Sequence, residues 1–377
     1  MEGMESMDRL RMKQAFLSHE GLVFTAMFTL IFTVTSLIMI DYRGLQSHVA
    51  GMDPFTILTL GAILAYLYKN SKFSFSRRKI LFLIVWGLYV LSVFASMLVA
   101  GHFVWTEAAV WVMLTVMLLY RMPAALFMYI AAGALISLPS LLLAGTTLNE
   151  SGATLVMVFA AGLIFMPKTN RALLWYMLPT LALLVVITTS RTAMALYLLA
   201  AAAQSAHINM YRTGRRQRKN FLMTAGAVIL VPLIMFGRRL YSYFIQGSLD
   251  RGGINFDRLT SGRYEPWQTV VSGSTWFGQG HDYVDFTHLL HVHNIIFDTL
   301  GRYGILTAVL FIALLSLTVL ISVIAVKNFN ITLFFIIFIL AGMFEYNYLF
   351  MFVYFSPVIL FFALIGLMMD DRDSGHI

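Results

Sequence analysis

The sequence predicts an all-α integral membrane protein that crosses the bilayer about twelve times and carries one long extracytoplasmic loop. Of its 377 residues, 59% are hydrophobic and 12% are charged, whereas a soluble domain carries about 25% charged residues. Apolar runs of about 20 residues recur along the chain, and a helix of that length spans a roughly 30 Å hydrocarbon core. Lysines and arginines gather in the short connections between these runs.

We expect one transmembrane domain, 1–377, rather than separate soluble domains. Its polar connections set the expected spans at 21–40, 54–68, 80–100, 103–120, 123–145, 152–167, 171–190, 192–211, 220–236, 304–326, 330–345 and 348–369. The loop at 237–303 separates the ninth span from the tenth. It is expected to hold short interfacial helices and, as a loop on a rigid scaffold, the functional residues.

The charge of the connections predicts the orientation. Lysines and arginines concentrate before the first expected span and after the second, fourth, sixth, eighth, tenth and twelfth. Because positive residues mark the cytoplasmic side, we expect both termini in the cytoplasm and the long loop outside. The remaining basic residues are all arginines, whose planar fork binds phosphate oxygens in pairs: Arg43, Arg191, Arg238, Arg239, Arg251, Arg258, Arg263 and Arg302.

Composition also excludes several classes. The net charge of +8 resides mainly in short connections, so it indicates membrane orientation and predicts no nucleic-acid partner. The chain has no cysteine, which excludes disulfides, thiolate metal sites and a cysteine nucleophile. The N-terminal segment shows no cleavage-site pattern, so the first apolar run is expected to be a retained span.

Arg191 lies in Thr188-Thr189-Ser190-Arg191-Thr192, at the outer end of a tight helical hairpin. One interpretation is an interfacial anchor. The other is a functional polar pocket, because ionisable groups at such depth tend to be functional.

Arg263 lies in Ser261-Gly262-Arg263-Tyr264-Glu265-Pro266-Trp267. Pro266 fits only the first turn of a helix, which places Arg263 near a helix N-terminus, where free backbone amides favour an anion. The alternative is a surface arginine paired with Glu265 or Asp257. For Arg238 and Arg239, contacts to lipid headgroups are favoured.

The loop also contains His281, His288, His291 and His293. Their spacing matches no standard zinc signature, so a single catalytic histidine among structural ones is favoured over a metal site. Histidine suits a general base near neutral pH. Phe277-Gly278-Gln279-Gly280 is predicted to be a tight turn and not a dinucleotide fingerprint, which needs a βαβ unit.

The stretch 293–326 has helical character throughout, yet at about 1.5 Å per residue it is too long for one span. Gly301 and Gly304 are the expected breakpoints. A short interfacial helix should therefore precede the tenth span. Asp298 and Arg302, four residues apart, are expected to pair along this helix.

Taken together, these motifs resemble those of the O-antigen ligase and O-antigen polymerase superfamily, bacterial membrane glycosyltransferases of the GT-C class. Ser190-Arg191 resembles its Ser-Arg motif. Ser261-Gly262-Arg263 with Trp267 resembles its Ser-Gly-Arg-x-x-x-Trp element. The pattern His293-Asn294, nine residues, Gly304, two residues, Thr307 resembles its histidine motif. The span count and the loop position fit the same architecture.

The resemblance implies a bacterial cytoplasmic (inner) membrane enzyme that acts at its outer face. The donor would be an oligosaccharide on undecaprenyl diphosphate, and the acceptor a glycan or lipid A-core. Membrane lipids and a chain-length regulator protein are the other expected partners. No metal and no cofactor is expected.

The resemblance also implies roles for individual residues. Arg191 and Arg263 would hold the diphosphate and stabilise its developing charge. His293 would take the proton from the acceptor hydroxyl, and the attack would invert the anomeric centre. Arg258, Glu265 and Asn294 are further candidates for substrate binding, and His291 is the alternative base.

A polymerase that joins repeat units into O-antigen, capsule or exopolysaccharide is the preferred function. A ligase that moves the polymer to lipid A-core is the alternative. A transporter of lipid-linked oligosaccharide is less favoured, because it would need ionisable residues within its spans. Here Glu107 and Glu345 lie near predicted span ends.

Overall fold

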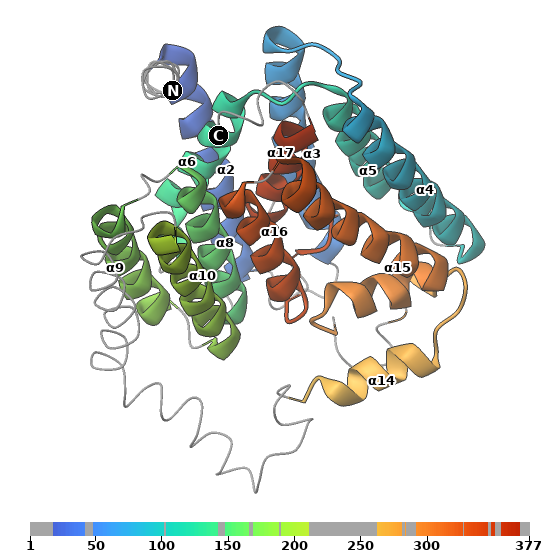
Figure 1. Cartoon of the computed structure of the whole chain (residues 1–377). Coiled ribbons are helices and arrows are strands. Elements are labelled where there is room, and N and C mark those ends of the chain that lie inside the picture. The colour runs from blue at the N-terminus through green and yellow to red at the C-terminus, as the bar shows by residue number, and fades with distance from the viewer. Residues whose placement is uncertain are drawn as a thin grey trace, which may run out of the picture.

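The computed structural model describes residues 18–41, 48–101, 103–141, 148–165, 169–187, 190–210, 262–280, 283, 292–326, 328–345, 348–350 and 356–369. Within these ranges the chain is all helical, and the one extended pairing is an isolated bridge between Phe73 and Tyr120. The helices pack into a bundle, and the short helix α14 lies across one end of it (Figure 1). This arrangement is consistent with a helical membrane protein.

The described helices follow the expected spans in order. They are α2 (His19–Asp41), α3 (His48–Asn70), α4 (Arg77–Val99), α5 (Trp105–Leu119), α6 (Ala124–Ser137), α8 (Leu148–Phe165), α9 (Asn170–Ile187), α10 (Arg191–Met210), α14 (Tyr264–Ser272), α15 (Ile295–Ile321), α16 (Phe329–Gly342) and α17 (Ser356–Met369). A π-helical turn, Ser322–Val326, continues α15. The expected span 220–236 lies outside the described residues, so the count of twelve stays a prediction.

One helix end differs from its predicted span edge. The helix expected to run to residue 145 ends at Ser137, although Leu138 still has helical dihedral angles (φ −51°, ψ −38°). Pro139 follows directly, and a proline has no backbone N–H to continue the ladder of helix hydrogen bonds. The last span was expected from residue 348; α17 is described from Ser356, with Pro357 in its first turn, and residues 351–355 lie outside the described residues.

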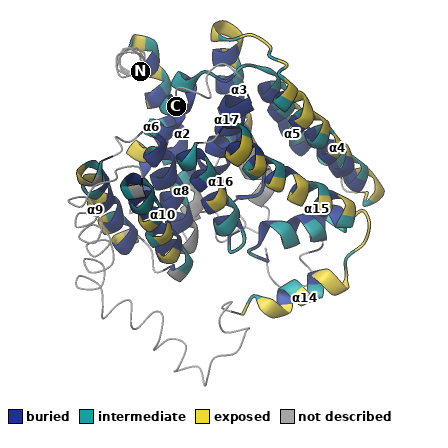
Figure 2. Ribbon diagram, viewed as in Figure 1, coloured by how far each residue is buried: buried dark blue, intermediate teal, exposed yellow. Residues whose placement is uncertain are grey.

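Three helices in the described part of the chain are long and apolar enough to cross a membrane: His19–Leu37, Arg77–Val99 and Ile295–Val326. Several shorter apolar helices accompany them, including α5, α6, α16 and α17. The outward face of α4 is apolar along its length, and Ile84, Leu88 and Leu91 are each more than half exposed. Exposed residues also run along α15 (Figure 2). Such apolar stripes suit contact with lipid tails rather than water.

The helices at the centre of the bundle are buried on all sides. Every residue of α17 is buried, and most residues of α8 and α16 are too. A helix that is hydrophobic all round is typical of the interior of a large helical assembly. The aromatic rings of Trp86, Phe350 and Phe362 interlock there at edge-to-face and tilted angles.

One end of the bundle, here called the lysine end, contains Lys69, Lys72, Lys79 and Arg121. Lys79 Nζ donates to the carbonyl of Tyr120 at 2.6 Å, and the amide of Arg121 donates to the carbonyl of Lys72 at 2.8 Å. Lys69 Nζ lies 3.3 Å from a carboxylate oxygen of Glu20. Four of the residues that the charge pattern assigned to one side of the membrane therefore lie at one end of the bundle.

The opposite end, here called the α14 end, contains α14, the start of α15 and the chain just after α16. The helix α15 is bent at Gly304 (φ 86°, ψ −178°), as the sequence predicted, so its first turns cross the direction of the remainder (Figure 1). Asp298 and Arg302 lie one turn apart in this first part. Both are buried, and they attract each other electrostatically.

The turn at 273–280 clasps the bend in α15. The backbone N–H of Gln279 donates to the carbonyl of Gly301 at 3.0 Å, and the backbone N–H of Ile305 donates to the carbonyl of Thr275 at 2.9 Å. Gly278 and Gly280 have positive φ angles of 71° and 69°, which confirms the predicted tight turn. In an unbroken helix the N–H of Ile305 would donate to the carbonyl of Gly301. At the bend both groups instead form hydrogen bonds with the 273–280 turn.

Candidate functional site

Glu345, just beyond the C-terminus of α16, connects the two residues that the sequence motifs single out. Its Oε1 atom lies 3.5 Å from Arg263 Nη2, and its Oε2 atom lies 3.5 Å from His293 Nδ1. The side chain of Glu345 is 3% exposed, that of Arg263 is 12% exposed and that of His293 is 32% exposed. Each carboxylate oxygen therefore faces one candidate site residue, and the histidine is the most accessible of the three.

The end of α16 is held by side chains from the other two segments. Arg263 Nη1 donates to the carbonyl of Phe344, and Asn294 Nδ2 donates to the carbonyl of Met343 at 3.1 Å. The last carbonyls of a helix have no partner within it and carry partial negative charge, so a cationic donor is favourable there. These bonds fix the backbone that carries Glu345.

Arg263 is the N-cap residue that directly precedes α14, and Pro266 lies in the first turn, as predicted. Its side chain makes no capping hydrogen bond to α14. The alternative of a surface arginine paired with Glu265 is wrong, because the guanidinium is mostly buried against Glu345. Glu265 itself is exposed on α14.

His293 has a left-handed backbone conformation (φ 51°), the one positive φ among non-glycine residues in the described part of the chain. Histidine is one of the residues that tolerate this region, which still costs about 1–2 kcal/mol. The next residue, Asn294, caps α15: its Oδ1 accepts from the amides of Ile296 and Phe297 at 2.9 and 3.2 Å. Asn294 is fully buried, and these bonds give its side chain a structural role; substrate binding by Asn294 stays a prediction.

Trp267 attaches α14 to the segment that carries His293. Its Nε1 atom donates to the carbonyl of Val292 at 2.8 Å, and its ring packs against Phe297 with centroids 5.4 Å apart. Val270, Tyr283 and Val292 form a small buried cluster beneath this contact. The tryptophan of the Ser-Gly-Arg-x-x-x-Trp element thus fixes Arg263 and His293 relative to each other.

Arg191 begins α10 at the same end of the bundle. His207 near the end of α10 stacks on Phe329 at the start of α16, with ring centroids 4.1 Å apart, so the two helices run in opposite directions. The first residue of α10 and the last residues of α16 therefore lie at the same end. The position of the Arg191 side chain lies outside what the structure describes, as do Arg258 and His291.

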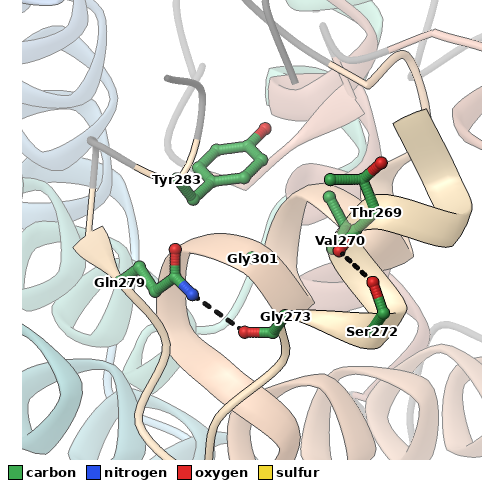
Figure 3. A pocket seen from close by; sticks show the side chains of 7 residues that line it. All are labelled: Thr269, Val270, Ser272, Gly273, Gln279, Tyr283 and Gly301. Carbon is green, nitrogen blue, oxygen red and sulfur yellow. Dashed lines mark hydrogen bonds between the residues drawn. The ribbon is translucent and has the colours of Figure 1, made fainter. Parts of the chain in front are cut away.

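A pocket of about 250 Å³ lies beside this site, between α14, the 273–280 turn and α15. Figure 3 shows Gln279 and Ser272 on its wall, where Gln279 donates to the carbonyl of Gly273 and Ser272 to that of Thr269. Neither Arg263, His293 nor Glu345 lines it. The pocket is thus separate from the charged cluster.

Glu345 is the site residue that no motif indicates. Its one signal in the sequence is a lone acidic residue immediately after a very apolar run. In the described part of the chain, no three histidine or carboxylate side chains lie close enough to hold a metal ion, and His281 and His288 fall outside it.

The chemical capacity of the cluster follows from its three groups. An accessible imidazole can exchange a proton, and a guanidinium beside it can stabilise negative charge on an oxygen. A buried carboxylate can orient both. Comparison with models of protein families and with curated proteins finds no match to this sequence.

Proposed function

We propose that this protein is a membrane glycosyltransferase that polymerises undecaprenyl-diphosphate-linked oligosaccharide repeat units into a surface polysaccharide. The proposal places the lysine end in the cytoplasm and the α14 end at the outer face of the bacterial cytoplasmic membrane. Its support is the ordered set of motifs together with one structural observation. Arg263 and His293, which come from separate motifs, contact the same buried carboxylate.

The proposed reaction is a direct displacement. The acceptor hydroxyl attacks the anomeric carbon from the face opposite the diphosphate, a carbon–oxygen bond forms, and the bond to the phosphate oxygen breaks. His293 takes the hydroxyl proton, and the electron pair of the broken bond leaves with undecaprenyl diphosphate. Inversion of the anomeric centre follows.

Arg263 supplies the charge that this departure needs. A guanidinium close to the leaving phosphate stabilises the developing negative charge more strongly in a dry site than it would in water. Arg191, at the same end of the bundle, is the second candidate for this role. With arginines opposite the diphosphate, the proposed transfer requires no metal ion or nucleotide sugar.

The orientation has support of its own. Four of the basic residues predicted to be cytoplasmic lie at one end, and Arg263 and His293 lie at the other. Exposed aromatic residues mark both ends, with Tyr68 near the first and Trp105 and Trp276 near the second. Tyrosine and tryptophan are enriched at both membrane surfaces.

Deletion of the gene in its host tests the proposal. Loss of a polymerase leaves single repeat units on the acceptor, so the ladder of surface polysaccharide on a gel should collapse to its lowest band. Loss of a ligase would instead leave bare acceptor while long lipid-linked polymer accumulates. An unchanged ladder in the deletion strain would rule out both activities.

A further inference from the structure

We propose that Glu345 is a positioning residue that orients His293 through Nδ1, so that Nε2 of the histidine is directed to the acceptor. This inference rests on the proposed glycosyl transfer and adds a residue that lies outside every motif. Neither the spacing of the motifs nor the composition assigns it a role.

The burial of Glu345 is the first argument. A carboxylate that is 3% exposed is costly unless charged or hydrogen-bonding partners surround it. Its Oε2 atom makes no hydrogen bond within the described part of the chain, and the ion-pair contact recorded for this oxygen is with His293 Nδ1, at 3.5 Å. That distance is slightly longer than an N–H···O hydrogen bond, and catalytic contacts often tighten only when substrate binds.

The rigidity of its attachment is the second argument. The carbonyls of Met343 and Phe344, which directly precede Glu345, accept from Asn294 and Arg263. A site geometry is maintained only when the supporting residues are themselves fixed. The carboxylate is thus presented from a fixed backbone to a histidine that has a constrained backbone of its own.

The chemical consequence concerns the tautomer of His293. A carboxylate opposite Nδ1 favours the form that carries its proton there, which leaves the lone pair on Nε2. When Nε2 accepts the proton of the acceptor hydroxyl, the resulting imidazolium is stabilised by the same carboxylate, which stays ionised throughout. Glu345 neither gains nor loses a proton in this step.

The competing role for Glu345 is purely structural: it would act as a strut, a residue that only holds α14 and α15 against α16. The two roles differ in one measurable respect. A strut contributes to activity whether or not the base is present, whereas a positioning residue that acts through His293 contributes little once His293 is replaced.

The experiment is a double-mutant cycle on full-length protein in nanodiscs, with transfer measured from lipid-linked oligosaccharide purified from the host. Glu345→Gln should lower kcat by about 10²–10⁴-fold with little change in KM for the donor. Glu345→Asp should recover part of the loss. In a His293→Asn background, Glu345→Gln should lower the residual rate by less than about threefold, because the residue no longer has a base to orient.

The control is Glu20→Gln. Glu20 pairs with Lys69 at the lysine end, so its replacement removes a carboxylate pair and should leave kcat unchanged. An equal loss from Glu345→Gln in both backgrounds would show a strut, and a Glu345→Gln enzyme with the wild-type rate would overturn the proposal. If the wild-type protein transfers no sugar, the proposed function itself is wrong.

A second measurement needs no variant of Glu345. Nitrogen NMR of histidine-labelled protein distinguishes the two neutral tautomers, and the His293 signals are those missing from His293→Asn. The proposal expects the Nδ1-protonated tautomer. The Nε2-protonated tautomer would contradict it whatever the activity of the Glu345 variants.

Discussion

The backbone of Gly278 packs directly against the backbone of Gly304, the residue at which α15 bends. A Cβ atom added to Gly304 would lie 2.3 Å from the nitrogen of Gly278, and one added to Gly278 would lie 2.3 Å from the carbonyl oxygen of Arg302. Both residues have positive φ angles. The contact therefore requires glycine on each side, and it determines how the segment that carries His293 is oriented.

Gly304→Ala should destabilise the protein and reduce transfer together. The added Cβ meets backbone that cannot move aside, and the left-handed conformation is unfavourable for alanine, so we expect a cost of about 2 kcal/mol or more. The thermal midpoint in detergent measures it. Gly61→Ala is the matched control, because a Cβ there meets nothing within 4 Å and the residue lies within α3. An equal thermal midpoint for the two variants would show that the contact between Gly304 and Gly278 does not require glycine.

Two replacements of His293 should distinguish its role as the base from the effect of its left-handed backbone on stability. His293→Asn and His293→Ala should both reduce transfer to a small residual rate, since neither residue can accept the hydroxyl proton. Asparagine tolerates a φ of 51° better than alanine, so His293→Ala should also lose about 1 kcal/mol of stability that His293→Asn retains. Thermal unfolding of the two purified variants checks the difference, and identical midpoints would contradict it.

Arg263→Lys should lower kcat/KM for the lipid-linked donor by about 10²-fold although the charge is kept. A lysine cannot reach the carbonyl of Phe344 and the carboxylate of Glu345 with the separate arms of a planar fork. Steady-state kinetics in nanodiscs provides the measurement. Arg171→Lys, on an exposed residue at the start of α9, should be neutral. Full activity of Arg263→Lys would mean that any positive charge suffices.

Trp267→Phe should loosen α14 without removing its ring contact to Phe297. The substitution leaves the buried carbonyl of Val292 without its donor, which costs about 1–3 kcal/mol. Amides of Tyr264–Ser272 should exchange with deuterium faster than in the wild type. Trp175→Phe, at an exposed position on α9, should leave that exchange unchanged. Unaltered exchange in Trp267→Phe would show that α14 is held by other contacts.

Transfer should survive treatment with a chelator. The diphosphate charge in the proposed reaction is met by arginine, so incubation with EDTA and removal of divalent ions should leave the rate of the purified enzyme unchanged. Loss of activity that zinc or magnesium restores would show that a metal ion takes part in the transfer.

Much of the fold near the site could be predicted because local chemistry determines it. Pro266 set the first turn of α14, and the length of the stretch after His293 required a break that Gly304 provides. The charge pattern grouped Lys69, Lys79 and Arg121 at one end. Each of these inferences depends on neighbouring residues or on helix length.

The partners of the site residues could not be predicted in the same way. Glu345 faces Arg263 and His293 only because α14, α15 and α16 meet at one end, and no local pattern encodes such a meeting. Asn294 also caps α15 and donates to the carbonyl of Met343, which the motif does not indicate. Its expected role in substrate binding stays a prediction.

In the proposed reaction, His293 is the base of an inverting glycosyl transfer from a lipid diphosphate. The most direct test incubates wild-type protein and His293→Asn with the purified lipid-linked oligosaccharide, then determines the anomeric configuration of the product by NMR. We predict an inverted linkage with the wild type and only a trace of product with His293→Asn at equal protein levels. A product of retained configuration, or full transfer by His293→Asn, would contradict it.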